Sequence, residues 1–187
     1  MPRLLFLGLH RRHRSPSQRF RFDHYIDYFE KSGYQVIYSH LLDKKADKIY
    51  YAKGRYMGKL LILLSSLWKR FKELAFIKDI DLVFVQREAF MLGSVFFESR
   101  WAKKAPLIYD FDDAIWLHQV SEGNKMLARL KDSSKTKKLI KIAHHVIAGN
   151  QYLADYALQF NYQVSVIPTT LDTQIFKPGI NHSQKIC

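Results

Sequence analysis

The stretch Pro-Leu-Ile-Tyr-Asp-Phe-Asp-Asp-Ala-Ile-Trp, residues 106–116, decides the fold. It begins as a short, mostly apolar run and then carries three carboxylates. Side chains alternate along an extended chain, so Asp110 and Asp112 point to one side and Asp113 begins the following loop. We therefore predict a buried strand over residues 106–111 with a polar carboxyl end.

The same kind of apolar run recurs along the chain, separated by helical patterns. Strands are predicted over residues 4–8, 35–41, 81–85, 106–111, 145–148 and 163–167. Helices are predicted over residues 15–32, 56–78, 89–104, 121–143 and 151–160, with a loop or short helix over 43–54. Strands that alternate with helices run parallel. We expect an α/β fold, a Rossmann-like three-layer parallel sheet over residues 1–168, with residues 169–187 as a connector.

Composition narrows the class of protein. The chain has 187 residues, is 48% hydrophobic and carries a formal net charge of +13, which suits one globular domain with anionic partners. Cys187 is the single cysteine, so no disulfide framework exists. The first apolar run precedes its arginines, the reverse of a secretory signal. We expect a cytoplasmic protein that can lie at the inner face of a membrane.

The loop after the first strand offers side-chain donors in place of a dinucleotide fingerprint. Gly8 is not part of a G-x-G-x-x-G run, which argues against a nucleotide-dependent oxidoreductase. Ser15, Gln18 and Arg19 sit near a predicted helix start, where amides and guanidinium groups bind phosphates or hydroxyls. The alternative is that Ser15 only caps that helix.

The acidic end of the fourth strand gives the catalytic candidates. Asp112 and Asp113 could orient or deprotonate a hydroxyl group. The alternative is that Asp113 caps a helix and Asp110 pairs with an arginine. A metal site needs more ligands than the nearby His118 supplies, so no metal and no cofactor are expected.

Two other strand ends carry polar candidates. Arg87 follows the third strand and could contact a ligand or pair internally with Glu88. Asn150 follows the fifth strand, and capping of the next helix would explain it without a ligand.

The helix predicted over residues 56–78 has a wide apolar face. Leu60, Leu64, Trp68 and Phe71 repeat at helical spacing among basic residues. A basic amphipathic helix can contact a membrane surface. A crossover helix that packs this face on the sheet is the preferred interpretation, because the fold needs a helix there.

Four stretches, taken in order, resemble the N-terminal domain of retaining GT-B glycosyltransferases of the group called group one or family four. They are S-P-S-Q-R-F-R (15–21), P-L-I-Y-D-F-D-D-A-I-W (106–116), A-H-H-V-I-A-G-N-Q-Y-L-A-D-Y-A (143–157) and V-I-P-T-T-L-D-T-Q-I-F-K-P (166–178). The resemblance implies the acceptor-side half of a GT-B fold, with a hinge at its end and the second, donor-binding domain absent.

The resemblance also implies an activity. The complete enzyme would transfer a sugar from a nucleotide-diphosphate sugar to a hydroxyl acceptor. Asp112 matches the position near the reacting sugar, with Asp113 beside it, and Ser15, Gln18 and Arg19 match the loop that faces the acceptor and the donor phosphates. Because the donor-binding half is missing, we expect the chain alone to be inactive.

The sequence departs from that group's pattern at one place, and one alternative function stays open. His10 and Arg11 stand where many members of that group have a Gly-Gly pair, which counts against close contact of backbone and diphosphate. The rival is a non-catalytic basic module for nucleic acid or an anionic membrane. Charge alone favours it, and without a nucleic-acid motif we do not expect nucleic acid as the partner.

Overall fold

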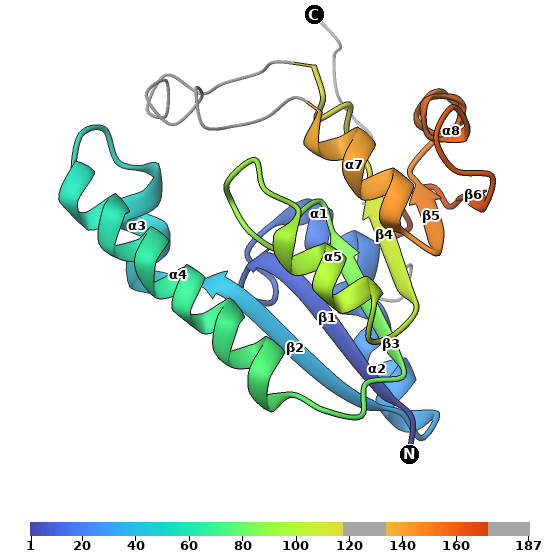
Figure 1. Ribbon diagram of the computed structural model, residues 1–187, viewed down its shortest axis with the longest axis horizontal. Helices are drawn as coiled ribbons and strands as arrows, with labels where there is room; N and C mark the ends of the chain where they lie inside the picture. The colour runs from blue at the N-terminus through green and yellow to red at the C-terminus, as the bar shows by residue number, and fades with distance from the viewer. Residues whose placement is uncertain (118–133, 172–187) are drawn as a thin grey trace, which may run out of the picture.

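The computed structural model describes residues 1–117 and 134–171 (Figure 1). Six strands form one parallel sheet in the order β2-β1-β3-β4-β5-β6. They are β1 (Arg3–His10), β2 (Gln35–Leu42), β3 (Leu82–Gln86), β4 (Leu107–Phe111), β5 (His145–Ala148) and β6 (Val164–Val166). The predicted α/β, Rossmann-like parallel sheet is confirmed.

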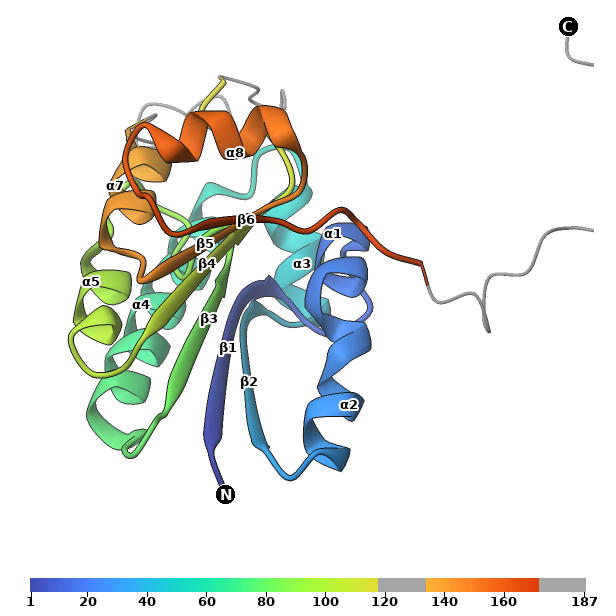
Figure 2. The same cartoon turned by 90° about the vertical axis from the view of Figure 1, so that its right-hand side faces the viewer.

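Helices cover both faces of the sheet. They are α1 (Pro16–Gln18), the π-helical η1 (Arg19–Asp23), α2 (His24–Lys31), α3 (Lys44–Tyr51), α4 (Tyr56–Phe76), α5 (Phe96–Ala102), α7 (Lys135–Ile142) and α8 (Gln151–Leu158). In Figure 2 the sheet is seen edge-on, with α1 and α2 on one side and α4, α5 and α7 on the other. The predicted helix over 121–143 is therefore present as α7, and its residues up to 133 lie outside the described part of the chain.

The strand order creates a switch point at the middle of the sheet. From β1 the chain moves outward to β2 through α2, and then returns across the other face through α4 to β3. The connections that leave β1 and β3 therefore diverge to opposite faces. Ligands of open parallel sheets bind at such a place, beyond the carboxyl ends of the strands.

Hydrophobic clusters on both faces of the sheet hold the layers together. On the α2 face, Phe6 stacks on Phe22 and Phe84 at ring-centroid distances of 5.2 and 5.1 Å, and Ile26 completes the cluster. On the other face the alternate residues of β1, β3, β4 and β5 pack against α5, α7 and α8. Its largest buried members are Trp101, Tyr109, Phe111, Leu5, Leu7, Leu107, Leu139 and Ile140.

The N-terminal helical segment differs from the single helix predicted over 15–32. A π-helical turn at η1 interrupts it and places Phe22 against the sheet, whereas Tyr25 is 36% exposed. The predicted end is correct, because Gly33 has a φ of 86°, which favours glycine.

Helix α4 corrects the prediction that its apolar face packs on the sheet. The helix is present, but Leu64 and Trp68 are 52% and 63% exposed. The buried positions are instead mostly polar or charged, among them Lys59, Ser66 and Arg70. Long-range polar contacts under the helix, which helical spacing does not reveal, set this orientation.

Arg70 makes most of those contacts. Its side chain is fully buried. Nε donates to the Ala89 carbonyl at 2.6 Å, and Nη1 donates to Ser39 Oγ and Glu73 Oε2, both at 2.6 Å. Nη2 donates to the Gly8 carbonyl at 3.3 Å. One guanidinium thus ties α4 to the ends of β1 and β3, and burial lowers its pKa against the opposing pull of Glu73.

The helix predicted over 89–104 is shorter than expected. Only α5, residues 96–102, is helical. The preceding segment stays irregular because side chains satisfy its backbone groups. The Ala89 N–H donates to Glu98 Oε1 at 2.9 Å, and Lys135 Nζ donates to the Leu92 carbonyl at 2.6 Å.

Replacing Arg70→Met should lower the free energy of unfolding by about 3–5 kcal/mol, since the change leaves buried carbonyls and Glu73 without their partner. Lys72→Met, at an exposed site on the same helix, should change it by less than about 0.5 kcal/mol. Urea unfolding of both variants measures the difference. Equal free energies of unfolding for the two variants would show that Arg70 does not hold α4 to the sheet.

Candidate functional site

The carboxyl ends of the strands form one polar rim, on which the N-terminal segment meets the acidic end of β4. Ser17 Oγ accepts a hydrogen bond from Gln86 Nε2 at 2.7 Å, at the end of β3. Four residues later Arg21 reaches Asp110 at the end of β4. These two contacts place the N-terminal segment along the carboxyl ends of β3 and β4.

Arg21 and Asp110 form a buried ion pair at the centre of the rim. Arg21 Nε lies 3.1 Å from both Asp110 carboxylate oxygens, and Nη2 also donates to Oδ1. Nη1 donates to the carbonyl of Ile167, after β6. The side chains of Arg21 and Asp110 are only 2% and 1% exposed. The alternative interpretation of Asp110, pairing with an arginine, is confirmed.

Burial dominates the protonation of Asp110. Desolvation raises its pKa from 3.8 to about 6, although Arg21 pulls the pKa down, and nearby Asp112 raises it further. Burying the ionised carboxylate of Asp110 therefore costs free energy, even though Arg21 pairs with it. The carboxylate depends on Arg21 to stay ionised at neutral pH.

Asp112 lies at the same edge, two residues beyond Asp110. Its Oδ1 atom is buried and has no hydrogen-bond donor among the described residues. Gly149, at the end of β5, passes so close that a Cβ there would lie 3.0 Å from Asp112 Cα. The lack of a side chain at Gly149 thus allows β5 to support the Asp112 backbone. Asp112 is a carboxylate placed at the rim with one acceptor atom unused.

Arg87 pairs with Asp113 and not with Glu88. Arg87 Nη2 lies 3.0 Å from Asp113 Oδ2, and both side chains are partly exposed. Glu88 instead accepts from Lys135 Nζ at 2.8 Å, so of the two alternatives for Arg87 the internal pair with Glu88 does not form. Arg87 also has a left-handed backbone with φ of 63° and donates its N–H to the Asp110 carbonyl at 2.9 Å. Strained backbone of this kind clusters at functional sites.

The candidates on the N-terminal loop divide into two kinds. Gln18 is buried and its amide is used internally: Oε1 accepts from the His10 N–H, and Nε2 donates to the His10 carbonyl and to Tyr38 Oη, all at 2.8–2.9 Å. Gln18 is therefore a positioning residue. Ser15 occupies the helix-cap position without a side-chain capping bond, and Arg19 is half-buried. Their side chains remain candidates for ligand contact.

A cluster that the sequence did not reveal anchors the basic loop. Asp47 of α3 accepts from Arg14 Nε at 2.6 Å and from Arg11 Nη1 at 3.5 Å, and it lies 3.7 Å from His10 Nδ1. Burial lowers the pKa of His10 to about 4, with Asp47 opposing, so this imidazole is neutral at neutral pH. The loop arginines are engaged with a carboxylate 33 and 36 residues away, and no local pattern signals that pairing.

Asn150 caps α8, as its alternative interpretation predicted. Its backbone is extended and its Oδ1 accepts from the Leu153 N–H at 3.0 Å. That bond uses one acceptor site of the side-chain carbonyl oxygen. The side chain is exposed at the end of β5, so the cap does not remove it from the rim.

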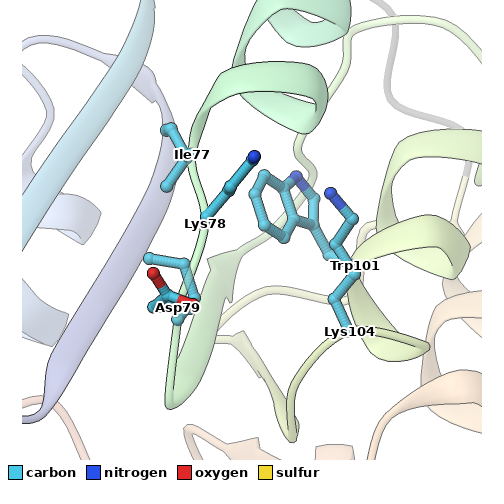
Figure 3. A pocket seen from close by; sticks show the side chains of 6 residues that line it. Ile77, Lys78, Asp79, Trp101 and Lys104 are labelled. Atoms are coloured by element: carbon cyan, nitrogen blue, oxygen red, sulfur yellow. The ribbon is translucent and has the colours of Figure 1, made fainter.

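Other parts of the described chain do not form a comparable site. A pocket lined by Ile77, Lys78, Asp79, Ile80, Trp101 and Lys104 lies just before β3, at the edge of the sheet opposite the rim (Figure 3). Within residues 1–117 and 134–171, no three His, Cys, Asp or Glu side chains group as metal ligands. No helix in those ranges is long and apolar enough to cross a membrane.

Comparison with protein-family models and with curated proteins gives no match. The functional argument therefore depends on the fold and on the geometry of the rim.

Arg21→Met should destabilise the protein more at pH 7.5 than at pH 5. The folded pKa of Asp110, about 6, exceeds its unfolded value of 3.8, so the wild-type protein loses stability as the pH rises through this window and then levels off. Without Arg21 the folded pKa rises further, so the loss continues above pH 6. The stability difference between variant and wild type should grow by about 1–2 kcal/mol from pH 5 to pH 7.5.

Urea unfolding at the two pH values measures this growth. Arg12→Met, which removes an exposed partner of Asp27, is the matched control and should show no such growth. A destabilisation by Arg21→Met that is the same at both pH values would contradict the assignment.

Proposed function

We propose that this chain is the acceptor-binding domain of a retaining glycosyltransferase that moves a sugar from a nucleotide-diphosphate sugar to a hydroxyl group. The observation that carries the proposal is Asp112. It is a carboxylate at the end of a central parallel strand, beside the Arg21–Asp110 pair, with a buried oxygen to which none of the described residues donates. A hydroxyl of the acceptor would supply that donor.

The residues around Asp112 suit this chemistry. A carboxylate that accepts a hydrogen bond from a hydroxyl group orients the lone pairs of the hydroxyl oxygen. It can also take the hydroxyl proton. Arg87 stands beside it, paired with Asp113 at a partly exposed position where a phosphate could compete for the guanidinium. In the proposed role Asp112 positions the acceptor, Arg87 and Arg19 contact donor phosphate, and a second domain supplies most contacts to the donor.

The end of β1 supports a transferase over a nucleotide-dependent oxidoreductase. In dinucleotide-binding domains a glycine there lets the backbone approach a pyrophosphate. Here a Cβ on Gly8 would meet the side-chain amide of Gln18 at 3.1 Å. The space above the glycine is therefore filled by the protein's own glutamine, which leaves no room for a pyrophosphate.

The pairing of the loop cations counts against the nucleic-acid rival. Arg11 and Arg14 share Asp47, and Arg21 is bound to Asp110. Phosphate-backbone binding requires cations that can exchange their counterions for phosphates. The rim therefore offers fewer such cations than its sequence suggests.

Ligand-observed NMR with a panel of methyl hexosides tests the acceptor site. We expect at least one member to bind the purified protein and Asp112→Asn to weaken it by about ten- to a hundredfold, since a hydrogen bond to a charged group contributes about 1.5–3 kcal/mol. Asp155→Asn, an exposed change on α8, is the matched control and should leave binding unchanged.

Three results would sink the proposal. They are no binding by any hexoside, binding that Asp112→Asn leaves unchanged, and salt-dependent binding of duplex nucleic acid that Asp112→Asn leaves unchanged. The last would favour the basic-module rival.

A further inference from the structure

Helix α4 is polar where it meets the sheet and apolar where it meets solvent. Six of its exposed apolar side chains form a stripe along the helix, hereafter the α4 stripe: Met57, Leu60, Leu61, Leu64, Trp68 and Phe71. Each is at least 44% exposed, and Met57, Leu61 and Trp68 exceed 60%. Phe96 of α5, 40% exposed, extends the stripe, since its ring centre lies 5.9 Å from that of Phe71. A contiguous apolar surface of this kind marks an interaction site, whereas isolated apolar residues do not.

Hydrogen bonds on the inner face of α4 keep the α4 stripe facing solvent. Rotating α4 to bury it would pull Arg70 away from the Gly8 and Ala89 carbonyls. It would also break the bond that Lys69 Nζ donates to the His40 carbonyl. Because these polar bonds hold the opposite face of the helix, exposure of the stripe is a property of the fold. In Figure 1 the helix runs along the outside of the molecule beside β2.

Cations border the α4 stripe. Lys53 and Arg55 are exposed just before the helix begins. Lys72 Nζ lies 5.3 Å from the centre of the Trp68 ring, and the guanidinium carbon of Arg100 lies 5.0 Å from that of Phe96.

Glu73, an acidic residue of α4, points away from the stripe. Glu73 turns inward to Arg70 and Ser39, so its charge does not offset the bordering cations. The stripe therefore combines large apolar groups with a border of positive charge.

We propose that the α4 stripe docks on an anionic phospholipid surface, with the helix lying in the plane of the interface. Leucine, tryptophan and phenylalanine on one side with lysine and arginine at the border are the composition of interfacial helices. Tryptophan suits this boundary because it has an apolar ring and a polar N–H. A second copy of the chain is a poorer occupant, because each copy carries a net charge of +13 and the two borders would repel. This inference does not depend on the sugar-transfer chemistry.

Vesicle flotation tests the proposal with the whole chain. We expect the protein to float with vesicles of phosphatidylcholine and phosphatidylglycerol, and far less with phosphatidylcholine alone. The double variant Leu61→Ser, Trp68→Ser should lower the partition coefficient by at least about tenfold. Both side chains are largely exposed, so unfolding in urea should stay near wild type.

A matched control removes equally exposed aromatic rings elsewhere. Tyr28 lies on α2 and Tyr162 follows α8, and they are 67% and 92% exposed. The double variant Tyr28→Ser, Tyr162→Ser should float like wild type. Trp68 fluorescence should also shift to shorter wavelength on anionic vesicles, and Trp68→Phe should abolish most of that shift while flotation persists.

Several outcomes would overturn the proposal. One is absence of flotation with anionic vesicles. Another is flotation that the Leu61→Ser, Trp68→Ser variant retains, which would assign binding to charge elsewhere. A third is a dimer in analytical ultracentrifugation that the same variant dissociates, with no lipid binding, which would make the stripe an interface between copies.

Discussion

The buried pair of Arg21 and Asp110 is the interaction on which the rim depends. Backbone carbonyls at the ends of a parallel sheet need hydrogen-bond donors, and here two buried guanidinium groups, one on each face, supply some of them. Arg21 ties the N-terminal helix to the ends of β4 and β6. Arg70, on the other face, ties α4 to the ends of β1 and β3. Through Asp110, Arg21 holds the N-terminal segment beside the strand end from which Asp112 follows.

The fold was largely readable from the sequence, because each strand is a short apolar run and each crossover is long enough for a helix. Failures occurred where distant side chains decided the outcome. The segment before α5 is irregular because Lys135, more than 40 residues away, binds its carbonyls. Helix α4 faces outward because the partners of Arg70 come from other strands. Apolar spacing alone predicted the helix correctly and its buried face wrongly.

The candidate site was predicted in outline and not in its contacts. The alternation of β4 placed Asp110 and Asp112 on one side, and the offered alternative of an arginine partner for Asp110 was correct. The amide of Gln18 is hydrogen-bonded to His10 and Tyr38. Residue patterns did not distinguish it from its neighbour Arg19 as a candidate for ligand contact. Asp47 was missed because its three basic partners follow a different strand. Pairings between strand ends depend on the order of strands, which residue patterns do not specify.

The central claim is that Asp110 is buried against Arg21 and thereby holds the N-terminal loop at the end of β4. Titration of the Asp110 carboxyl carbon by ¹³C NMR tests it most directly, because that signal reports on one group. The account predicts a pKa near 6 in the folded protein, well above the 3.8 of an unperturbed aspartate. A pKa at or below 3.8 would contradict it, since burial would then not outweigh the pull of Arg21 and the pair would not be desolvated as described.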